Sequence, residues 1–292
     1  MYDYKLLETL LAVVEEGSFE EAGNRLYITQ SAVTQRIKLL EELSGQILLS
    51  RTQPPTPTES GQVLVEHCRK VNLLEKELNN PLSRNHSLSK IPLAVNSDSI
   101  ATWFAPVITE YYKRGNAYLE IRREDQDMTQ DLLMKGEVMG AISSYSGKIR
   151  GCRSWSLGEM VYRFCATRSY VDSYIKGSNI SDVVSSIPVL NFSPEDTLIL
   201  QWLRQTNPKA EPPVLSHYLP SSDGFPHVIG AGSVSGMLTE SQFQEYKNQY
   251  DLVDLSEDKP IAIPLYWHRW SVESIELNLL TELILKYSEG LK

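Results

Sequence analysis

The sequence predicts an α/β protein built from a helical N-terminal domain, one long helix and a larger region of mixed strands and helices. Three observations support this prediction. Apolar residues recur at helical spacing over residues 4–44, a heptad-like pattern follows in residues 58–80, and from residue 91 short β-rich runs alternate with helical segments. At 292 residues the chain is long enough for two or three domains.

The composition is that of a folded protein without a membrane segment. Hydrophobic residues make up 41% of the chain and charged residues 22%, and no apolar run reaches the ~18 residues needed to cross a bilayer. The N-terminus lacks the order of a signal peptide, and Cys68, Cys152 and Cys165 form neither a disulfide framework nor a C-x-x-C zinc pair. We therefore expect a cytoplasmic protein with no membrane partner, no metal and no cofactor.

Residues 4–16 predict the first helix, because apolar residues recur on one helical face: Leu6, Leu7, Leu10, Val13 and Val14. Gly17 ends this helix. Ser18 can cap a second helix that ends near Tyr27, with Glu21 completing a capping box.

A third helix is expected from residue 30 to about residue 44, with Thr29 as its cap. Its buried face would hold three apolar residues: Val33, Ile37 and Leu40. Its outward face would hold polar residues: Gln30, Ser31, Thr34, Gln35 and Lys38. Two short helices in this order form a helix-turn-helix, whose second helix can enter the DNA major groove and read bases with Gln, Ser and Thr. The alternative is an ordinary solvated helix face.

Residues 46–61 read as two short extended pieces around a proline-rich tip, since a proline cannot donate to a strand ladder. Arg51, beside this tip, is placed to contact the DNA backbone as a wing. The predicted DNA-binding residues are therefore Thr29, Gln30, Ser31, Thr34, Gln35, Lys38 and Arg51.

Charge is unevenly distributed along the chain. The formal net charge is −9, yet residues 22–58 hold four basic residues against two acidic ones, after a strongly acidic stretch at residues 1–21. This weakly basic segment supplies few phosphate contacts per chain, so we expect two paired chains to double them.

Residues 58–80 predict one long helix with coiled-coil spacing, because apolar residues recur along one stripe: Leu64, Val71, Leu74 and Leu78. We assign this stripe to dimerisation, within a homodimer or homotetramer. The alternative is that the helix packs on its own domain.

From residue 91 the pattern predicts an α/β sheet arranged as two lobes. The β-rich runs lie at residues 91–95, 118–124, 138–143, 161–167, 187–192 and 261–267. The helical patterns lie at residues 100–113, 127–135, 196–205 and 274–287.

Residues 4–62 resemble the N-terminal domain of LysR-type transcriptional regulators, in "GSFEEAGNRLYITQSAVTQRIKLLEELSG", the following "LL-x-R" and "PTESG". Two stretches, "RTQPPTPTESGQ" and "LAVNSDSIATWFAPV", are similar to the ArgP branch, also called chromosome initiation inhibitor, and its lysine-export-regulating relatives. Two residues depart from the pattern. Gly23 replaces a common alanine, at a cost of about 1 kcal/mol in helix propensity, and Thr56 replaces an arginine that could contact phosphate.

The resemblance implies a winged helix-turn-helix, a linker helix, a hinge and a two-lobed effector domain like periplasmic solute-binding proteins, at residues 1–58, 59–80, 81–90 and 91–292. Lobe I would comprise about residues 91–160 and 266–292, and lobe II about residues 161–265. The chain would cross between the lobes near Gly158–Arg163 and Pro264–His268.

By the same resemblance, the effector is a basic amino acid such as lysine or arginine, bound between the lobes where strands end and helices begin. Its carboxylate needs hydrogen-bond donors and its side chain needs an anion. The predicted effector residues are Ser97, Asp98, Ser99, Thr102, Ser143 and Ser222. Asp98 is the favoured anion, and the alternatives are Asp125, Asp127, Glu195 and Asp223. Helix capping is the competing role for each of these side chains.

The partners implied are double-stranded DNA and a small-molecule effector, with control of amino-acid transport or metabolism genes. An alternative is non-sequence-specific DNA binding that affects replication initiation. An enzyme is disfavoured, because "GSVSG" places Val234 where a nucleophile elbow needs serine and the histidines show no metal-binding spacing. The recognition-helix pattern disfavours a plain solute-binding protein.

Overall fold

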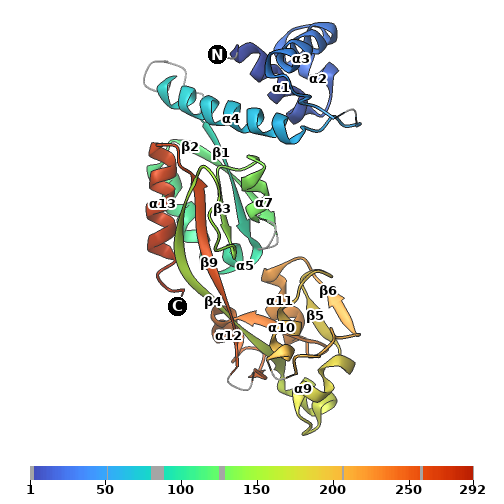
Figure 1. Cartoon of the computed structure of the whole chain (residues 1–292). Helices are drawn as coiled ribbons and strands as arrows, with labels where there is room; N and C mark the ends of the chain where they lie inside the picture. Colours follow the sequence, from blue (N-terminus) through green and yellow to red (C-terminus); the bar gives the residue numbers. More distant parts are fainter. Residues whose placement is uncertain are drawn as a thin grey trace.

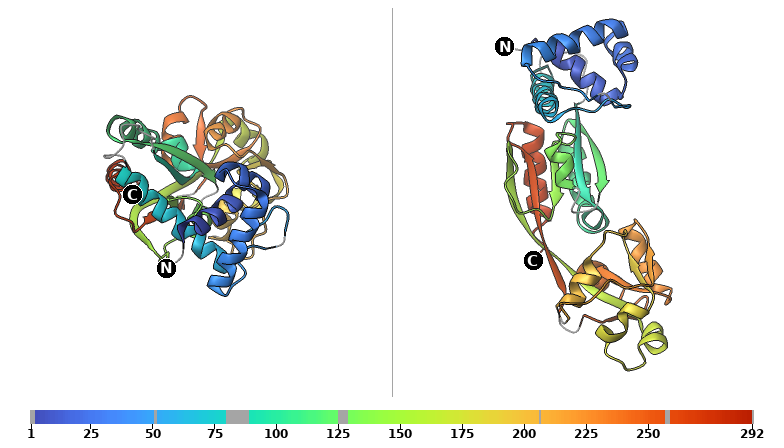
Figure 2. Two further views of the ribbon diagram at one scale, coloured as in Figure 1. Left: turned by 90° about the horizontal axis from the view of Figure 1, so that it is seen from above. Right: turned by 45° about the vertical axis from the view of Figure 1, so that its right-hand side comes forward.

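The computed structural model describes residues 3–50, 52–79, 89–124, 129–205, 207–256 and 259–291. It is elongated, with a helical head at one end, helix α4 beneath the head, and two α/β lobes stacked below (Figure 1). The right-hand view of Figure 2 shows the same stacking of head, lobe I and lobe II, and the left-hand view looks down on it from above. The predicted α/β class and the order of its parts are confirmed.

The head contains α1 (Tyr4–Glu16), α2 (Phe19–Leu26) and α3 (Gln30–Ser44), with bounds close to those predicted. Apolar side chains from all three helices form a core separate from that of the lobes. Its fully buried members include Leu10, Val13, Ala22, Val33 and Leu40.

Local signals set the ends of these helices. Gly17 and Gly45 take the left-handed conformation, with φ of 64° and 66°, as is usual for a glycine that ends a helix. The Ser18 hydroxyl accepts from the backbone N–H of Glu21 at 3.4 Å, as predicted. The second half of the predicted capping box is wrong, because the Glu21 carboxylate instead accepts from the Asn24 amide at 3.4 Å.

Gly23 lies where the chain turns from α2 toward α3. A Cβ at this position would lie 2.8 Å from the carbonyl oxygen of Ile28, so the bare backbone allows the turn to pack against α2. Tyr27, which ends α2, has a left-handed φ of 55° in the same turn. The glycine therefore has a packing role that offsets its low helix propensity.

Helix α4 (Glu59–Asn79) begins just after Thr58, whose hydroxyl accepts from the backbone N–H of Gly61 at 3.1 Å. Val65 and Cys68 on this helix are fully buried in the head core. One face of α4 thus packs on its own domain, as the alternative interpretation expected.

The rest of α4 leaves apolar side chains partly uncovered. Leu64 and Val71 are half-buried, and Leu74 is 45% exposed. Val63 is 62% exposed on the same helix. The side chain of Leu78 lies outside the described residues. Dimerisation through this stripe stays a prediction.

Lobe I begins with β1 (Ser89–Asn96), so the predicted hinge at residues 81–90 overlaps this strand, and its remaining residues lie outside the described part. Strands β2 (Ala117–Glu124) and β3 (Gly140–Ser143) pair with β1 in parallel. The helices of this lobe are α5 (Ser97–Thr102), α6 (Ala105–Arg114), α7 (Thr129–Met134) and α13 (Ile275–Tyr287).

Lobe II holds shorter elements. Its strands are β5 (Val189–Asn191), β6 (Ser216–Tyr218), β7 (Ser235–Thr239) and β8 (Leu252–Asp254). Its helices are α8 (Arg168–Tyr170), α9 (Ile180–Val183), α10 (Leu198–Arg204), α11 (Phe225–Gly230) and α12 (Glu240–Tyr246). Single turns of other helix types lie at Val171–Ile175, Val184–Ser186 and Ser222–Gly224.

Two long strands connect the lobes. β4 (Cys152–Thr167) and β9 (Ile261–Trp270) pair antiparallel and run from lobe I into lobe II (Figure 1). The strand order β2-β1-β3-β9-β4-β7-β5-β6 places this pair at the centre, with β8 also on β4. The register of β4 shifts at Gly158, whose φ is 105° and whose missing side chain leaves room for the carbonyl oxygen of Leu291.

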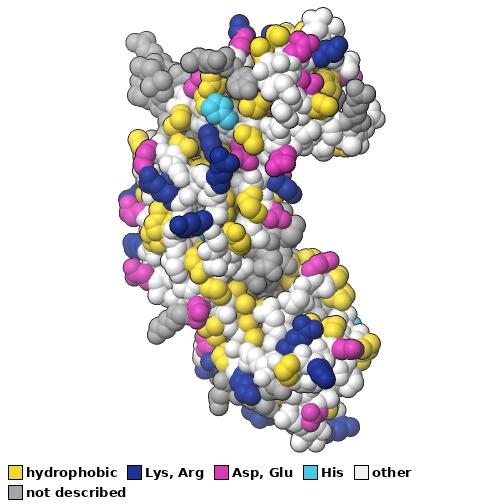
Figure 3. Space-filling model, viewed as in Figure 1, with side chains coloured by type: hydrophobic (Ala, Val, Ile, Leu, Met, Phe, Trp, Pro, Cys, Tyr) yellow, Lys and Arg dark blue, Asp and Glu magenta, His cyan; other side chains and the backbone are white. Residues whose placement is uncertain are grey.

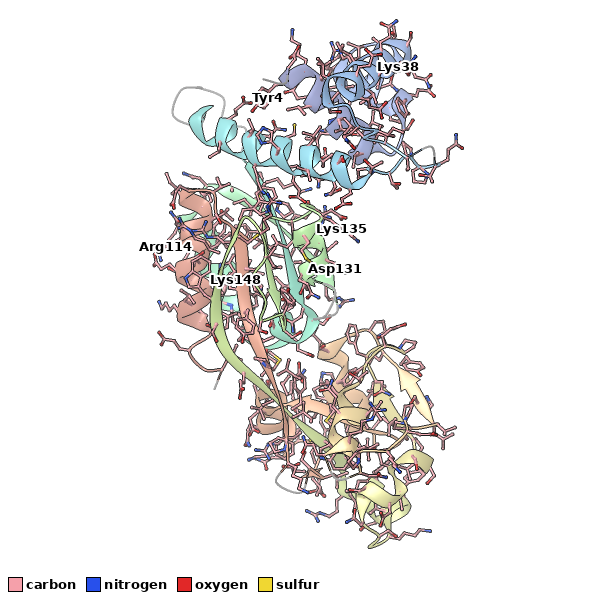
Figure 4. All side chains as sticks on the ribbon, viewed as in Figure 1. Tyr4, Lys38, Arg114, Asp131, Lys135 and Lys148 are labelled. Atoms are coloured by element: carbon pink, nitrogen blue, oxygen red, sulfur yellow. The ribbon has the colours of Figure 1, made fainter. Side chains whose placement is uncertain are left out.

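Polar contacts join α4 to lobe I. The Arg69 guanidinium donates to the carbonyl oxygen of Gly136 at 2.7 Å and lies 3.5 Å from the Glu15 carboxylate of α1. The Gln62 amide donates to the carbonyl oxygen of Lys135, which Figure 4 shows directly below α4. These side chains therefore link the head, the linker helix and the loop after α7.

Candidate functional site

The outward face of α3 has the predicted polar character. Thr29 caps the helix by accepting from the backbone N–H of Ala32 at 3.2 Å. The predicted contact residues of this face are all exposed: Thr29, Gln30, Ser31, Thr34, Gln35 and Lys38. Lys38 lies at the outer end of the head, far from the lobes (Figure 4). The helix is thus free along the side that a DNA groove would approach.

A groove of about 1660 Å³, its open mouth included, separates α3 from the proline-rich tip. Its helix side is lined by Gln30, Thr34 and Lys38, and its far side by residues 52–55. The two predicted extended pieces are joined by an antiparallel bridge between Leu49 and Pro57. The geometry allows α3 and this wing to contact one duplex together.

Hydroxyl groups hold the wing together. The Ser50 hydroxyl lies 2.6 Å from that of Thr56 and 2.7 Å from that of Thr52. The Ser50 backbone N–H donates to the carbonyl oxygen of Thr56 at 2.8 Å. Thr56 therefore stabilises the wing internally. Arg51 lies outside the described residues, so its predicted phosphate contact stays a prediction.

The basic charge available to DNA is smaller than the sequence count implies. Arg25 lies 2.8 Å from Glu15 and 3.0 Å from Glu16, so its charge is compensated within the head. The Arg36 guanidinium turns toward α1, 3.4 Å from the Thr9 hydroxyl. Over the lobes, basic and acidic side chains are interspersed on the face shown in Figure 3. A single head therefore offers DNA a weak positive field.

A second hollow lies between the lobes. Figure 1 shows that α5 lies at the end of lobe I that faces lobe II. It encloses about 530 Å³, its mouth included, and is lined by Asn96, Ser97, Asp98, Tyr162, Phe192, Asp196, Leu198, Ser222, Phe225, Met237 and Gln242. Three predicted effector residues are among them: Ser97, Asp98 and Ser222. Folding thus brings residues 96–98 of lobe I against residues 192–242 of lobe II.

The other three predicted effector residues do not line this cavity. Thr102 donates its hydroxyl proton to the carbonyl oxygen of Asp98 at 2.6 Å within α5. The Ser143 hydroxyl accepts from the backbone N–H of Tyr145 at 3.2 Å. Ser99 is fully buried and is not among the lining residues. Thr102 and Ser143 thus make local hydrogen bonds to the backbone, but neither bond caps the start of a helix.

Asp98 is the central anion of the cavity. Its carboxylate accepts from the Tyr162 hydroxyl at 2.6 Å and from the Ser222 hydroxyl, so it connects both lobes. Burial raises the pKa of Asp98 above its ordinary value, and the two hydrogen bonds oppose that shift. The carboxylates of Asp196 and Asp223 raise the pKa further. A cationic ligand would relieve this cost.

Asp196 was missed by sequence reasoning, which chose its neighbour Glu195. The Asp196 carboxylate lines the cavity and accepts from the backbone N–H groups of Phe192 and Leu198 at 2.9 and 3.0 Å. The signal lay in "NFSPED", because an acidic residue two positions before a helix start can bind that helix's amides. Glu195 and Asp223 do not line the cavity, and Asp125 and Asp127 lie outside the described residues.

His268 has a structural role. It is fully buried, with Nδ1 lying 2.7 Å from the Ser154 hydroxyl and Nε2 lying 2.8 Å from the carbonyl oxygen of Tyr145. Burial lowers the pKa of His268, which favours the neutral imidazole. Trp267 and Trp270 on the same strand pack in the core.

Residues 4–62 match the model of the family described as "Bacterial regulatory helix-turn-helix protein, lysR family". The whole chain is 39% identical over 292 residues to the lysine export transcriptional regulatory protein LysG of Corynebacterium glutamicum, covering 98% of each chain. The chain belongs to the LysR family. Membership in this family of transcriptional regulators confirms the predicted DNA-binding function and the expectation that the protein is not an enzyme.

Two solved structures of LysR-family proteins resemble the chain along its full length. ArgP from Mycobacterium tuberculosis has a TM-score of 0.90 at 33% identity, covering 100% of this chain and 99% of that one. Full-length LysG from Corynebacterium glutamicum with the bound effector Arg has a TM-score of 0.84 at 36% identity, covering 100% of both. Among the described helices of this LysR-family chain, none has the length and apolar character needed to span a membrane.

Proposed function

We propose that this LysR-family regulator reads an operator through α3 and the wing of paired heads, and that a basic amino acid bound between its lobes changes this reading. The observation that carries the proposal is the inter-lobe cavity with Asp98 and Asp196 in its wall. The LysG relative with bound arginine supports the ligand class. Controlled genes for amino-acid transport or metabolism, and a cytoplasmic location, belong to the same proposal.

The cavity offers a cationic side chain two carboxylates in a confined space. An ion pair there compensates the desolvation of both partners only if hydrogen bonds complete the geometry. Asp98 already has such support from Tyr162 and Ser222, so its carboxylate is oriented before the ligand arrives. A neutral or anionic side chain would leave this carboxylate uncompensated.

On the DNA side, we propose that Gln30, Ser31, Thr34 and Gln35 face base edges. Thr29, Lys38 and Arg51 would contact phosphates and fix the position of the head. The weak positive field of one head favours two heads on one operator, paired through the stripe Leu64, Val71, Leu74 and Leu78. The domain limits at residues 58, 80 and 90 belong to this proposal too.

Ligand control then requires that the ligand bind two arrangements of the protein unequally. Asp98 and Ser97 come from lobe I, whereas Asp196 and Ser222 come from lobe II, so a ligand that contacts both sets favours the closed arrangement. Lobe I is joined to α4 and the head through Arg69, so closure can alter how paired heads sit on DNA.

The decisive experiment is sequencing of the genomic fragments that the full-length protein retains, with and without lysine or arginine. We expect a small set of partly palindromic sites whose occupancy changes with the amino acid, near transport or amino-acid genes. Retention of fragments without sequence preference, with a steep salt dependence and equal competition by random DNA, would instead support the alternative of non-sequence-specific binding.

A further inference from the structure

Asn96 occupies a position where asparagine normally caps a helix, yet it does not do so. It ends β1 and immediately precedes α5, with φ of −66° and ψ of 149°, but its side chain makes no capping hydrogen bond. The residue is only 1% exposed and lines the inter-lobe cavity. Capping, the usual reason for an asparagine here, therefore does not explain this side chain.

Neither polar atom of the Asn96 side chain has a hydrogen-bond partner among the residues that the structure describes. The neighbouring Ser97 hydroxyl, on a residue 7% exposed, is in the same condition. Buried polar groups in folded proteins are almost always paired, because leaving them unpaired forfeits their hydration without return. Three unpaired atoms on adjacent residues at one cavity indicate that a ligand completes these bonds.

The chemistry of the three atoms indicates what the ligand presents. An amide places a donor, Nδ2–H, next to an acceptor, Oδ1, and Ser97 adds a second donor. The head group of a free α-amino acid presents a carboxylate that accepts and an ammonium that donates, side by side. The acidic part of the cavity, formed by Asp98 and Asp196, can accept from a cation but cannot donate to a carboxylate when ionised.

We propose that Asn96 and Ser97 form the subsite for the α-amino-acid head group. Asn96 Nδ2–H and the Ser97 hydroxyl donate to the α-carboxylate, and Asn96 Oδ1 accepts from the α-ammonium. This inference rests on the proposed function and deepens it, because it names the residues that bind the head group of the basic amino acid. Diamines that lack the carboxylate, and amino acids blocked at either end of the head group, are excluded.

The test uses the full-length protein with Asn96→Leu, which keeps the size and removes both polar atoms. Calorimetry would compare lysine, arginine, cadaverine, lysinamide and Nα-acetyl-lysine. For wild type we expect binding of lysine or arginine and at least tenfold weaker binding of the other three. For Asn96→Leu we expect lysine affinity to fall on the order of 10- to 100-fold, the loss typical of hydrogen bonds to charged groups.

Thermal unfolding without ligand separates this role from a structural one. Because the Asn96 side chain has no hydrogen-bond partner within the described part of the chain, Asn96→Leu should leave the melting temperature unchanged or raise it. The matched control is Asn191→Leu in lobe II, at the end of β5, where the buried Asn191 amide donates to the Ser216 hydroxyl at 3.3 Å. We expect this control to lower the melting temperature and to retain lysine binding.

A second variant keeps an acceptor at the same place. Asn96→Asp presents a carboxylate to the head group, so lysine should bind more weakly and cadaverine more strongly than to wild type. The ratio of the two affinities should therefore shift toward the diamine. An unchanged ratio would count against Asn96 as a head-group contact.

The outcomes distinguish this inference from the proposed function. Unchanged lysine affinity in Asn96→Leu, or equal affinity of wild type for lysine and cadaverine, would overturn the head-group subsite and leave the basic-amino-acid effector in place. If wild type bound a neutral amino acid such as leucine in preference to lysine, and Asn96→Leu lost that binding, the basic effector would be overturned and the head-group subsite would stand. Failure of wild type to bind any of the common amino acids would overturn both.

Discussion

The DNA-reading face and the inter-lobe cavity are assembled in opposite ways. The face is one continuous exposed segment, in which Thr29 to Lys38 follow each other along α3. The cavity is buried and takes its walls from six separate stretches between residues 96 and 242. Changes in the face should therefore act on DNA alone, whereas changes in the cavity act on ligand binding and, through the lobes, on DNA.

The largest effect is expected from Asp98→Asn in the cavity. Removing one partner of a confined ion pair costs about 2–5 kcal/mol, so lysine or arginine affinity should fall by a factor on the order of 100 or more. DNA binding without ligand should be unchanged, because Asp98 is remote from the head. Calorimetry and operator binding would measure both, with Glu195→Gln, an acidic residue outside the cavity, as the matched control.

The next effect is expected in the head. Gln35→Ala should weaken operator binding by about 1–3 kcal/mol and random-DNA binding much less, because an amide that pairs with a base carries sequence information. Arg51→Ala should weaken both, as expected for a phosphate contact. Fluorescence anisotropy with the two DNAs would measure this. Equal losses for both variants on both DNAs would contradict the roles assigned to these residues.

Low pH should weaken ligand binding in the cavity through protonation of Asp98. Since the pKa of Asp98 is raised in the ligand-free fold, lysine binding has to displace a proton at low pH, and affinity should drop by up to about tenfold per pH unit below that pKa. Wild-type and Asp98→Asn proteins would be titrated with lysine across this range. A wild-type affinity independent of pH there would exclude Asp98 as the cation's partner.

The raised pKa of Asp98 should also change how the stability of the folded protein depends on pH. The folded, ligand-free protein binds the Asp98 proton more tightly than the unfolded chain. The stabilisation from this group is therefore complete below the ordinary aspartate pKa and is lost as pH rises through the raised value. Asp98→Asn should lack this decline, and lysine should restore stability to wild type at higher pH. Denaturant unfolding at several pH values would show both.

The smallest effect on stability is expected at the connection between the regions. Arg69→Gln removes a partly exposed ion pair with Glu15 and a hydrogen bond to Gly136, for which a loss of about 0.2–1 kcal/mol is typical. Ligand affinity and ligand-free operator affinity should change little. The change in operator affinity on adding lysine should shrink, because the lobe and the head are less tightly joined. An undiminished lysine response would show that coupling uses other contacts.

The contrast between the continuous face of α3 and the cavity built from distant segments also explains which features could be predicted from the sequence. The bounds of α1, α3 and α4 follow from local signals, such as Gly17 and Thr29, that act within a few residues. The first half of β4 was missed because exposed polar side chains and Gly158 interrupt its pattern. β7 was missed because its first two residues, Ser235 and Gly236, end the small-residue stretch "GSVSG", which does not look like a strand, although all five residues of β7 are buried.

The cavity was predicted only in part for the same physical reason. Ser97 and Asp98 lie in a strand-to-helix junction that the sequence marks, and Ser222 lies in a second one. Tyr162 and Gln242 join them only because β4 crosses between the lobes and α12 packs beside it. No short sequence pattern predicts such contacts between residues that are far apart in the chain. Whether Glu195 or Asp196 lines the cavity depends on the backbone conformation of the turn before α10, which the sequence pattern does not specify.

The contact between Gly158 and Leu291 has a practical consequence. Because Leu291 lies against the register shift of β4 at Gly158, a fluorescent label attached near residue 291 would lie beside the strands that connect the lobes (Figure 1). A second dye on the outer strand β6, for instance in place of the exposed Tyr218, would travel with lobe II. Energy transfer between the two dyes, measured on single molecules in solution, would then report the closure of the two lobes.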